Sequence, residues 1–312
     1  MITSTVSNSE PVTTTEIVRT DALTKSYGDQ LAVDNVALTV RAGEIYGFLG
    51  PNGAGKTTTL RMLVGLIRPS SGTARVFGCA PGDPETLTRL GVLIESPGFY
   101  PYLSGRDNLR VMARYRRLPD SAVEEALDRV ALTARGDDKF RTYSHGMKQR
   151  LGVGCALLGN PDLLILDEPT NGFDPAGMAE MRELITDLAA HGHTVLLSSH
   201  LLAEVQEICD RVGVINGGKL LAESTVAEMR GSATVFVRAE PETIAFDAVR
   251  AAVGSAALTT GGIRIDAGAE AAPLVARAIV EAGADLHELR IDERSLEEVF
   301  FELTTTEAEA GK

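Results

Sequence analysis

Ten consecutive residues, GPNGAGKTTT from Gly50 to Thr59, combine the residue types that bind a chain of phosphates. The stretch fits the pattern G-x-x-x-x-G-K-[ST]. Its glycines let backbone N–H groups point at phosphate oxygens, and the helix that follows adds its positive N-terminal end. Lys56 would reach the β- and γ-phosphates, and the hydroxyl of Thr57 could bind Mg²⁺. We therefore predict a nucleotide-binding loop formed by Gly50, Asn52, Gly53, Ala54, Gly55, Lys56, Thr57 and Thr58.

Two acidic residues, Asp167 and Glu168, directly follow the apolar run LLIL of residues 163–166. The run predicts a central strand, and the carboxyl ends of such strands are where α/β sheets bind ligands. Asp167 would hold magnesium through water, and Glu168 would polarise the water that attacks the γ-phosphate. An Asp-Glu pair is usually only the exit from a strand, but the phosphate loop makes the catalytic interpretation the stronger one.

The elements around these residues indicate an α/β fold. Residues 16–50 are strand-like, and an amphipathic helix follows the phosphate loop. The pattern turns helical between about 104 and 158, and strand signals return at LLILD and TVLLSSH. We therefore expect a parallel sheet flanked by helices, with a helical insertion.

The composition changes near residue 230. Residues 232–312 contain 7 basic and 15 acidic residues, and their pattern of short strands and two helices predicts a small α+β module. The expected organisation is a disordered tail at 1–15, a nucleotide-binding domain at 16–230 with a helical subdomain at about 100–158, an accessory α+β domain at 231–306, and a tail at 307–312.

The overall composition excludes several classes of protein. With 30 basic and 43 acidic residues the net charge is −13, which disfavours nucleic acid as a partner. The three cysteines lie far apart, which argues against a zinc site or a disulfide framework and suits a reducing compartment. The N-terminal residues do not resemble a secretory signal, and no run approaches the roughly 20 apolar residues of a membrane span. Any action on a membrane is therefore expected to need a partner.

Over about residues 16–223 the sequence resembles the nucleotide-binding subunits of ABC transporters, with the family's motifs in order. YSHGM matches the family signature, usually Leu-Ser-Gly-Gly-Gln, and retains Ser144 and Gly146. His200 in LLSSH matches the switch histidine, which would contact the γ-phosphate and help to orient water. Tyr27 matches the aromatic residue that stacks on adenine. Asp174 in NGFDP matches the loop after the two carboxylates.

The resemblance implies a P-loop NTPase cassette with a mixed-sheet core, which binds ATP and Mg²⁺. Glu168, His200 and Lys56 would be catalytic, and Ser144 and Gly146 would bind the nucleotide held by a second copy. Two subunits, either identical or this chain with a paralogue, would sandwich two ATP molecules. Hydrolysis would open the dimer and drive an integral membrane permease, with the protein in the cytoplasm on the inner face of the membrane.

Three positions depart from the family pattern. His145 and Met147 replace the usual Gly and Gln of the signature, and the bulk of His145 is expected to restrict the approach of its helix to nucleotide. Glu95 replaces a Gln that ligates magnesium and joins the cassette to the membrane subunit. A carboxylate can also ligate Mg²⁺, so altered metal affinity or coupling is expected.

The segment LIESPGFY, residues 93–100, resembles the branch that exports or confers immunity to drugs and peptide antibiotics, and the C-terminal module resembles extensions on drug-exporter subunits. Residues 95–102 and the following helix GRDNLRVMARYRRL would dock the permease. The arginines of that helix equally suit a solvated helix face.

Two other functions would need features of their own. A soluble cassette ATPase that acts on ribosomes or DNA would have two cassettes or long coiled coils, and the sequence predicts neither. A degenerate cassette that binds ATP only as a structural switch would not need Lys56, Asp167, Glu168 and His200 together. The sequence therefore favours an exporter ATPase.

Overall fold

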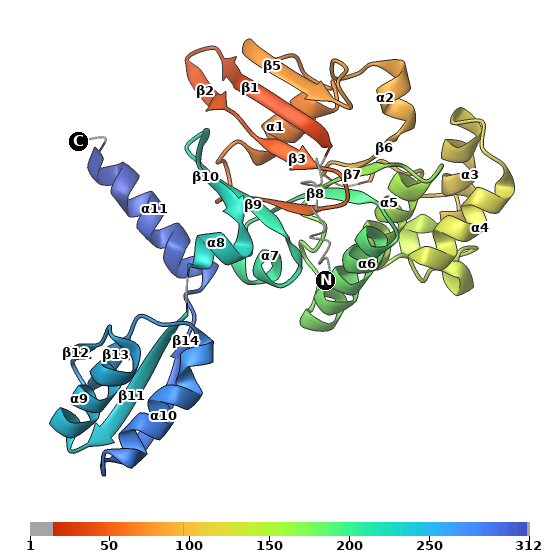
Figure 1. Ribbon diagram of the computed structural model, residues 1–312. Helices are drawn as coiled ribbons and strands as arrows, with labels where there is room; N and C mark the ends of the chain where they lie inside the picture. The colour runs from red at the N-terminus through yellow and green to blue at the C-terminus, as the bar shows by residue number, and fades with distance from the viewer. Residues whose placement is uncertain (1–14, 96, 232, 311–312) are drawn as a thin grey trace, which may run out of the picture. The chain divides into compact units, whose positions relative to one another are not determined.

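The computed structural model describes residues 15–95, 97–231 and 233–310, and the chain forms two compact units that divide between Glu223 and Ser224 (Figure 1). The boundary expected from the sequence lies after α8 (Val226–Arg230), whereas the structure assigns α8 to the C-terminal unit. The expected N-terminal tail, except for Thr15, lies outside the described residues.

A six-stranded sheet forms the centre of the first unit, in the order β10-β9-β4-β8-β7-β6. The pairs β4–β9, β4–β8, β7–β8 and β6–β7 are parallel. Every residue of β4, β7 and β8 is buried, as expected for strands covered by helices on both faces. The strands are β4 (Ile45–Leu49), β6 (Leu90–Leu93), β7 (Leu163–Asp167), β8 (Thr194–Ser199), β9 (Arg211–Asn216) and β10 (Lys219–Thr225).

A second, antiparallel sheet packs over α1 (Lys56–Leu63), as Figure 1 shows. Its strand β1 (Glu16–Tyr27) pairs with β2 (Gln30–Val36), β3 (Thr39–Arg41) and β5 (Ser71–Val76). Leu60 and Leu63 of α1 are buried in one hydrophobic core with residues of both sheets. This core holds α1, the helix that follows the phosphate loop, in place between the two sheets.

Helices cover the rest of the central sheet and form the insertion. Helix α5 contacts β7, α6 contacts β8 and α7 contacts β4. Ser104 and Ser144 cap the starts of α3 and α5, since each hydroxyl accepts a bond from a backbone N–H three residues later. The helices are α2 (Pro84–Thr88), α3 (Gly105–Tyr115), α4 (Asp120–Arg129), α5 (His145–Leu157), α6 (Pro175–Ala190) and α7 (Leu202–Ile208). The predicted α/β cassette with a helical insertion is confirmed.

The C-terminal unit is a four-stranded antiparallel sheet, in the order β12-β13-β11-β14, with its core against two helices. Val235 and Val237 of β11 lie in that core with Val249 of α9 and Ile279 of α10. Helix α11 continues past residue 306, where a tail was expected, because its last residues include the helix formers Ala and Glu. The elements are β11 (Thr234–Glu240), α9 (Glu242–Val253), β12 (Ala257–Thr259), β13 (Gly262–Ile265), α10 (Ala272–Glu281), β14 (Asp285–Asp292) and α11 (Leu296–Ala310).

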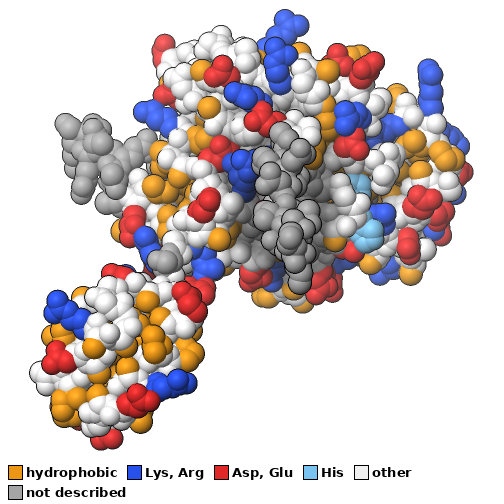
Figure 2. Space-filling model, viewed as in Figure 1, with side chains coloured by type: hydrophobic (Ala, Val, Ile, Leu, Met, Phe, Trp, Pro, Cys, Tyr) orange, Lys and Arg blue, Asp and Glu red, His pale blue; other side chains and the backbone are white. Residues whose placement is uncertain are grey.

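Two surface properties bear on function. Acidic and basic side chains are interspersed over the face of the first unit that Figure 2 shows, unlike the clustered basic face of a nucleic-acid-binding protein. Within the described ranges, no helix combines the length and apolar character needed to cross a bilayer.

Candidate nucleotide-binding site

The loop between β4 and α1 has the shape that its glycines allow. Gly53 and Gly55 have φ values of 81° and 107°, which L side chains rarely adopt. A Cβ at Gly50 would lie 2.2 Å from the carbonyl oxygen of Ile215, and one at Gly55 would lie 2.5 Å from that of Ala32. Neither position has room for a side chain, so the loop keeps its backbone exposed to a ligand.

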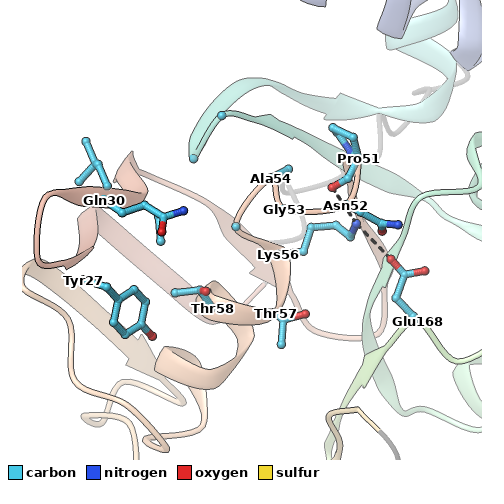
Figure 3. Close-up of a pocket in the computed structure, with 15 residues that line it drawn as sticks. Tyr27, Gln30, Pro51, Asn52, Gly53, Ala54, Lys56, Thr57, Thr58 and Glu168 are labelled. Atoms are coloured by element: carbon cyan, nitrogen blue, oxygen red, sulfur yellow. Dashed lines mark hydrogen bonds and ion pairs between the residues drawn. The ribbon is translucent and has the colours of Figure 1, made fainter.

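Lys56 lies at the centre of the site. Its ammonium group is buried and donates to the carbonyl oxygens of Gly50, at 2.7 Å, and Pro51, at 3.3 Å. It also forms an ion pair with Glu168, marked by a dashed line in Figure 3. Nζ of Lys56 lies 3.0 Å from Oε1 of Glu168. Because Lys56 is the first residue of α1, its charge adds to the positive end of the helix dipole.

Asp167 is held from two sides. The hydroxyl of Thr57 donates to its Oδ2 at 2.7 Å, and the hydroxyl of Ser198 donates to its Oδ1 at 2.5 Å. Strands β7 and β8 are parallel neighbours with Asp167 opposite Ser198, so this contact follows from the sheet order. Thr57 and Asp167 thus place a hydroxyl and a carboxylate together, the oxygen donors that Mg²⁺ prefers.

Glu168 connects Lys56 to His200. Its Oε2 lies 2.6 Å from Nδ1 of His200, while its Oε1 contacts Lys56. The backbone N–H of Glu168 donates to the carbonyl and the hydroxyl oxygens of Ser198. Its φ of 50° is unusual for a residue other than glycine, and such strained residues cluster at functional sites.

Lys56, Thr57 and Glu168 border a cleft of about 560 Å³, a size suited to a nucleotide. Tyr27 stands at its rim with 49% of its surface exposed, at the opposite end of the cleft from Glu168 (Figure 3). Of the residues predicted from the sequence, the cleft is lined by Tyr27, Asn52, Gly53, Ala54, Gly55, Lys56, Thr57, Thr58 and Glu168.

Six further residues line the cleft but were not predicted from the sequence: Gln30, Leu31, Ala32, Pro51, Gly217 and Gly218. The Gly-Gly pair between two strand-like runs was the available signal for Gly217 and Gly218. The structure explains their position, because the N–H of Gly218 donates to the carbonyl oxygen of Ala54 at 3.0 Å. Nothing in the local pattern indicates that a turn so far along the chain closes the cleft.

Comparison with known proteins identifies the family. A family model described as ABC transporter matches residues 33–171, which include the phosphate loop and both carboxylates. The chain is 49% identical over 211 residues to the bacitracin transport ATP-binding protein BcrA of Bacillus licheniformis, covering 66% of this chain and 69% of that protein. It is 36% identical over 301 residues to the uncharacterized ABC transporter ATP-binding protein YdbJ of Bacillus subtilis (strain 168), covering 95% and 98%. The chain belongs to the ABC transporter ATP-binding proteins.

A solved structure of an ABC transporter subunit has the same fold as the first unit of this chain. The ATP binding subunit of an ABC transporter superposes with a TM-score of 0.62 at 30% identity, covering 69% of this chain and 92% of that one. This protein is therefore an ABC ATPase, which binds ATP and couples its hydrolysis to transport with a membrane permease component. The comparisons favour this function over a soluble cassette ATPase that acts on ribosomes or DNA.

Three of the residues that the resemblance assigned to the ABC ATPase site lie away from the cleft. Ser144 is exposed and caps α5 by accepting a bond from the N–H of Met147, and Gly146 lies in the first turn of that helix. Glu95 is exposed and pairs with Arg61 of α1 at 2.5 Å. Their roles as in-trans nucleotide ligands and as a metal ligand stay predictions.

A second buried carboxylate, Glu204 of α7, stands next to the ABC ATPase site. Its Oε2 accepts a bond of 2.7 Å from the hydroxyl of Thr170, two residues after Glu168. Its Oε1 is buried and has no hydrogen-bond partner within the part of the chain that the structure describes. Burial raises the pKa of Glu204, while the Thr170 bond and the charges of Arg182 and His200 act in the opposite direction.

Proposed function

We propose that this ABC ATPase drives a separate membrane permease that exports a drug or peptide antibiotic, or confers immunity to it. The observation that carries the proposal is the 49% identity to a protein named for bacitracin transport. The segment LIESPGFY and the C-terminal extension support the same class. The protein would lie in the cytoplasm, on the inner face of the membrane beside its permease.

The residues of the cleft fit a bound Mg-ATP. Thr57 and Asp167 would hold Mg²⁺, the latter through water, with Glu95 as a further candidate ligand. Mg²⁺, when bound, supplies neutralisation of charge on the β- and γ-phosphates. Tyr27 would stack on adenine, and the backbone of the phosphate loop with Lys56 would hold the phosphates.

Within this arrangement Glu168 would act on the attacking water. Its carboxylate is fixed between Lys56 and His200, so its orientation is set before nucleotide binds. His200 would orient that carboxylate and contact the γ-phosphate. Lys56 would exchange part of its contact with Glu168 for phosphate oxygens when ATP is bound.

Two copies would be needed for a complete site. Ser144 and the first residue of α5, His145, are exposed and do not line the cleft. In the proposed sandwich Ser144 and the start of α5 bind the γ-phosphate held by the other copy. The pair would be two identical chains or this chain with a paralogue. Loss of the γ-phosphate would remove the bridge between the copies and let them separate.

The permease is proposed to dock on residues 95–102 and on α3. Tyr100 and Tyr102 are 49% and 66% exposed and have ring centroids 5.8 Å apart, the kind of aromatic surface that interfaces favour. Three of the arginines of α3 and its C-terminus are engaged within the chain, and one of them, Arg110, pairs with Asp107 at 3.1 Å. Arg106 pairs with Glu124 and Asp137, and Arg116 donates to the carbonyl oxygen of Leu90. Arg114 and Arg117 are exposed and remain available to a partner.

Affinity capture tests this function. The Glu168→Gln protein, loaded with ATP, is captured from detergent-solubilised native membranes, and its partners are identified by mass spectrometry. A multi-span membrane protein in stoichiometric amount is expected, and its identity narrows the cargo. Ribosomal or DNA-associated partners without a permease would overturn the proposal.

A further inference from the structure

His145, which departs from the family signature, contacts the loop that follows the catalytic carboxylates of its own chain. Its Nε2 lies 2.8 Å from the carbonyl oxygen of Asn171. Because a carbonyl oxygen only accepts, the Nε2 atom carries the proton and donates it. The imidazole also lies against Gly172, where an added Cβ would come within 2.9 Å of the ring.

A second contact holds the same two segments together. The ring of Phe173 lies over Gly146, where an added Cβ would come within 3.1 Å of Cε1. The same ring lies over Gly177 in the first turn of α6, where a Cβ would come within 2.5 Å. One hydrogen bond therefore joins the start of α5 to residues 171–173. Two glycines also make the packing possible, because Gly172 leaves room for the ring of His145 and Gly146 leaves room for the ring of Phe173.

The loop continues this connection to Glu168. The N–H of Asn171 donates to the carbonyl oxygen of Glu168 at 3.1 Å, and the N–H of Phe173 donates to that of Thr170 at 3.2 Å. Residues 168–173 thus form a hydrogen-bonded turn that begins at the catalytic carboxylate. At the other end of the connection, His145 is the neighbour of Ser144, whose hydroxyl caps α5.

We propose that His145 is a positioning residue that fixes Ser144 relative to Glu168 of the same copy. The inference rests on the proposed sandwich of two copies, in which Ser144 binds the nucleotide of the partner and Glu168 acts on its own. His145 then couples the two nucleotide sites, because the state of one site moves Glu168, and the turn 168–173 passes that shift to Ser144. Occupation of one site would favour the competent arrangement at the other, which is positive cooperativity in ATP.

Three substitutions of His145 separate the hydrogen bond from the bulk of the ring. His145→Gln places an amide N–H where Nε2 lies, His145→Leu keeps bulk without a donor, and His145→Gly restores the residue usual in the family. The purified full-length protein is assayed for steady-state ATPase activity over a range of ATP concentrations, and for binding of a fluorescent ATP analogue at concentrations where it is monomeric.

The leucine and glycine variants are expected to lose about two- to tenfold in kcat, the effect of one neutral hydrogen bond, and to lose cooperativity in ATP. Analogue binding should stay within about twofold of the parent, because His145 does not line the cleft. His145→Gln should restore both kcat and the Hill coefficient. If His145 had a role in folding alone, all three variants would have a lower thermal midpoint. The glutamine variant would then not differ from the leucine and glycine variants in kcat and Hill coefficient.

Two results overturn the inference in different ways. If Glu168→Gln forms an ATP-dependent dimer but the leucine and glycine variants have the kcat and Hill coefficient of the parent, His145 has no positioning role and the proposed function stands. If Glu168→Gln stays monomeric in Mg-ATP by light scattering over a wide range of protein concentration, the sandwich fails and the inference fails with it.

Discussion

Nδ1 of His200 lies 2.6 Å from Oε2 of Glu168, and this contact joins the ends of two neighbouring strands. The other oxygen of the carboxylate faces Lys56, so Glu168 has a fixed orientation although it follows the last residue of its strand. In the proposed role of general base, Glu168 would need little reorganisation when the reaction begins, which is the main advantage of a preorganised site.

Glu168→Gln is expected to reduce kcat by at least about 100-fold, the usual contribution of a general base. The amide is similar in shape to the carboxylate, so ATP still binds and the ATP-bound dimer accumulates. Phosphate release and light scattering measure the two effects. Glu183→Gln on the exposed face of α6 is the matched control and should behave as the parent. Equal and negligible activity in the parent and in Glu168→Gln would instead indicate a cassette that only binds ATP.

Lys56→Ala is expected to weaken ATP binding by about 100-fold, because it removes the charged donor at the centre of the phosphate loop. The variant also leaves the carboxylate of Glu168 without its cation, next to the incoming phosphates. Equilibrium binding of a fluorescent ATP analogue measures the loss. Lys139→Ala, an exposed lysine of the helical insertion, serves as the control. Parent-like affinity in Lys56→Ala would contradict the assigned site.

Substitutions of Glu95 and Arg61 test whether Glu95 is a metal ligand, because they should shift the Mg²⁺ requirement in opposite directions. Their ion pair is exposed, so breaking it should change the free energy of unfolding by less than about 1 kcal/mol. If Glu95 is a metal ligand, Glu95→Gln removes negative charge and should raise the Mg²⁺ concentration for half-maximal ATPase activity about three- to tenfold. Arg61→Ala frees the carboxylate and should lower that concentration.

A titration of ATPase activity with Mg²⁺ at fixed ATP measures both shifts, with Glu85→Gln of α2 as the control. Curves that coincide with the parent for both variants would place Glu95 outside the metal site.

Glu204→Gln should stabilise the protein at alkaline pH. The pKa of Glu204 is raised in the folded state, so folding favours its protonated form. The stability that this form contributes is fully present below the pKa of the unfolded chain and is lost as pH rises through the folded pKa. Glutamine stays neutral at every pH, so the variant keeps this stability. At pH 8 its free energy of unfolding is expected to exceed that of the parent by about 1 kcal/mol.

Thermal unfolding followed by circular dichroism checks this at several pH values, because the chain has no tryptophan for fluorescence. A gain of that size corresponds to roughly 2–4 °C, and it should shrink as the pH falls toward 5. A difference between variant and parent that is independent of pH would mean that Glu204 does not titrate in this range. The charged groups that influence it are Arg182, His200 and Glu168, so Glu183→Gln is again the control.

The amino-acid sequence determined the parts of the site that are local. The phosphate loop is fixed by glycines within a few residues of Lys56, since only glycine fits the backbone at Gly53 and Gly55. Asp167 and Glu168 come at and directly after the end of an apolar run of strand length, which the structure shows to be the buried strand β7. In such segments the spacing along the chain is also the spacing in space, so the pattern carries the geometry.

The tertiary structure decided which side chains meet. The order β4-β8-β7 in the sheet brings Lys56, Glu168 and His200 together. Local patterns had predicted the roles of Lys56 and Glu168, whereas the role of His200 came from the resemblance to a family. The closure of the cleft by Gly217 and Gly218, the pairing of Glu95 with Arg61, and the contact of His145 with Asn171 were not predicted. Each joins segments far apart in the chain, and such contacts depend on strand order and packing, which no short stretch of sequence specifies.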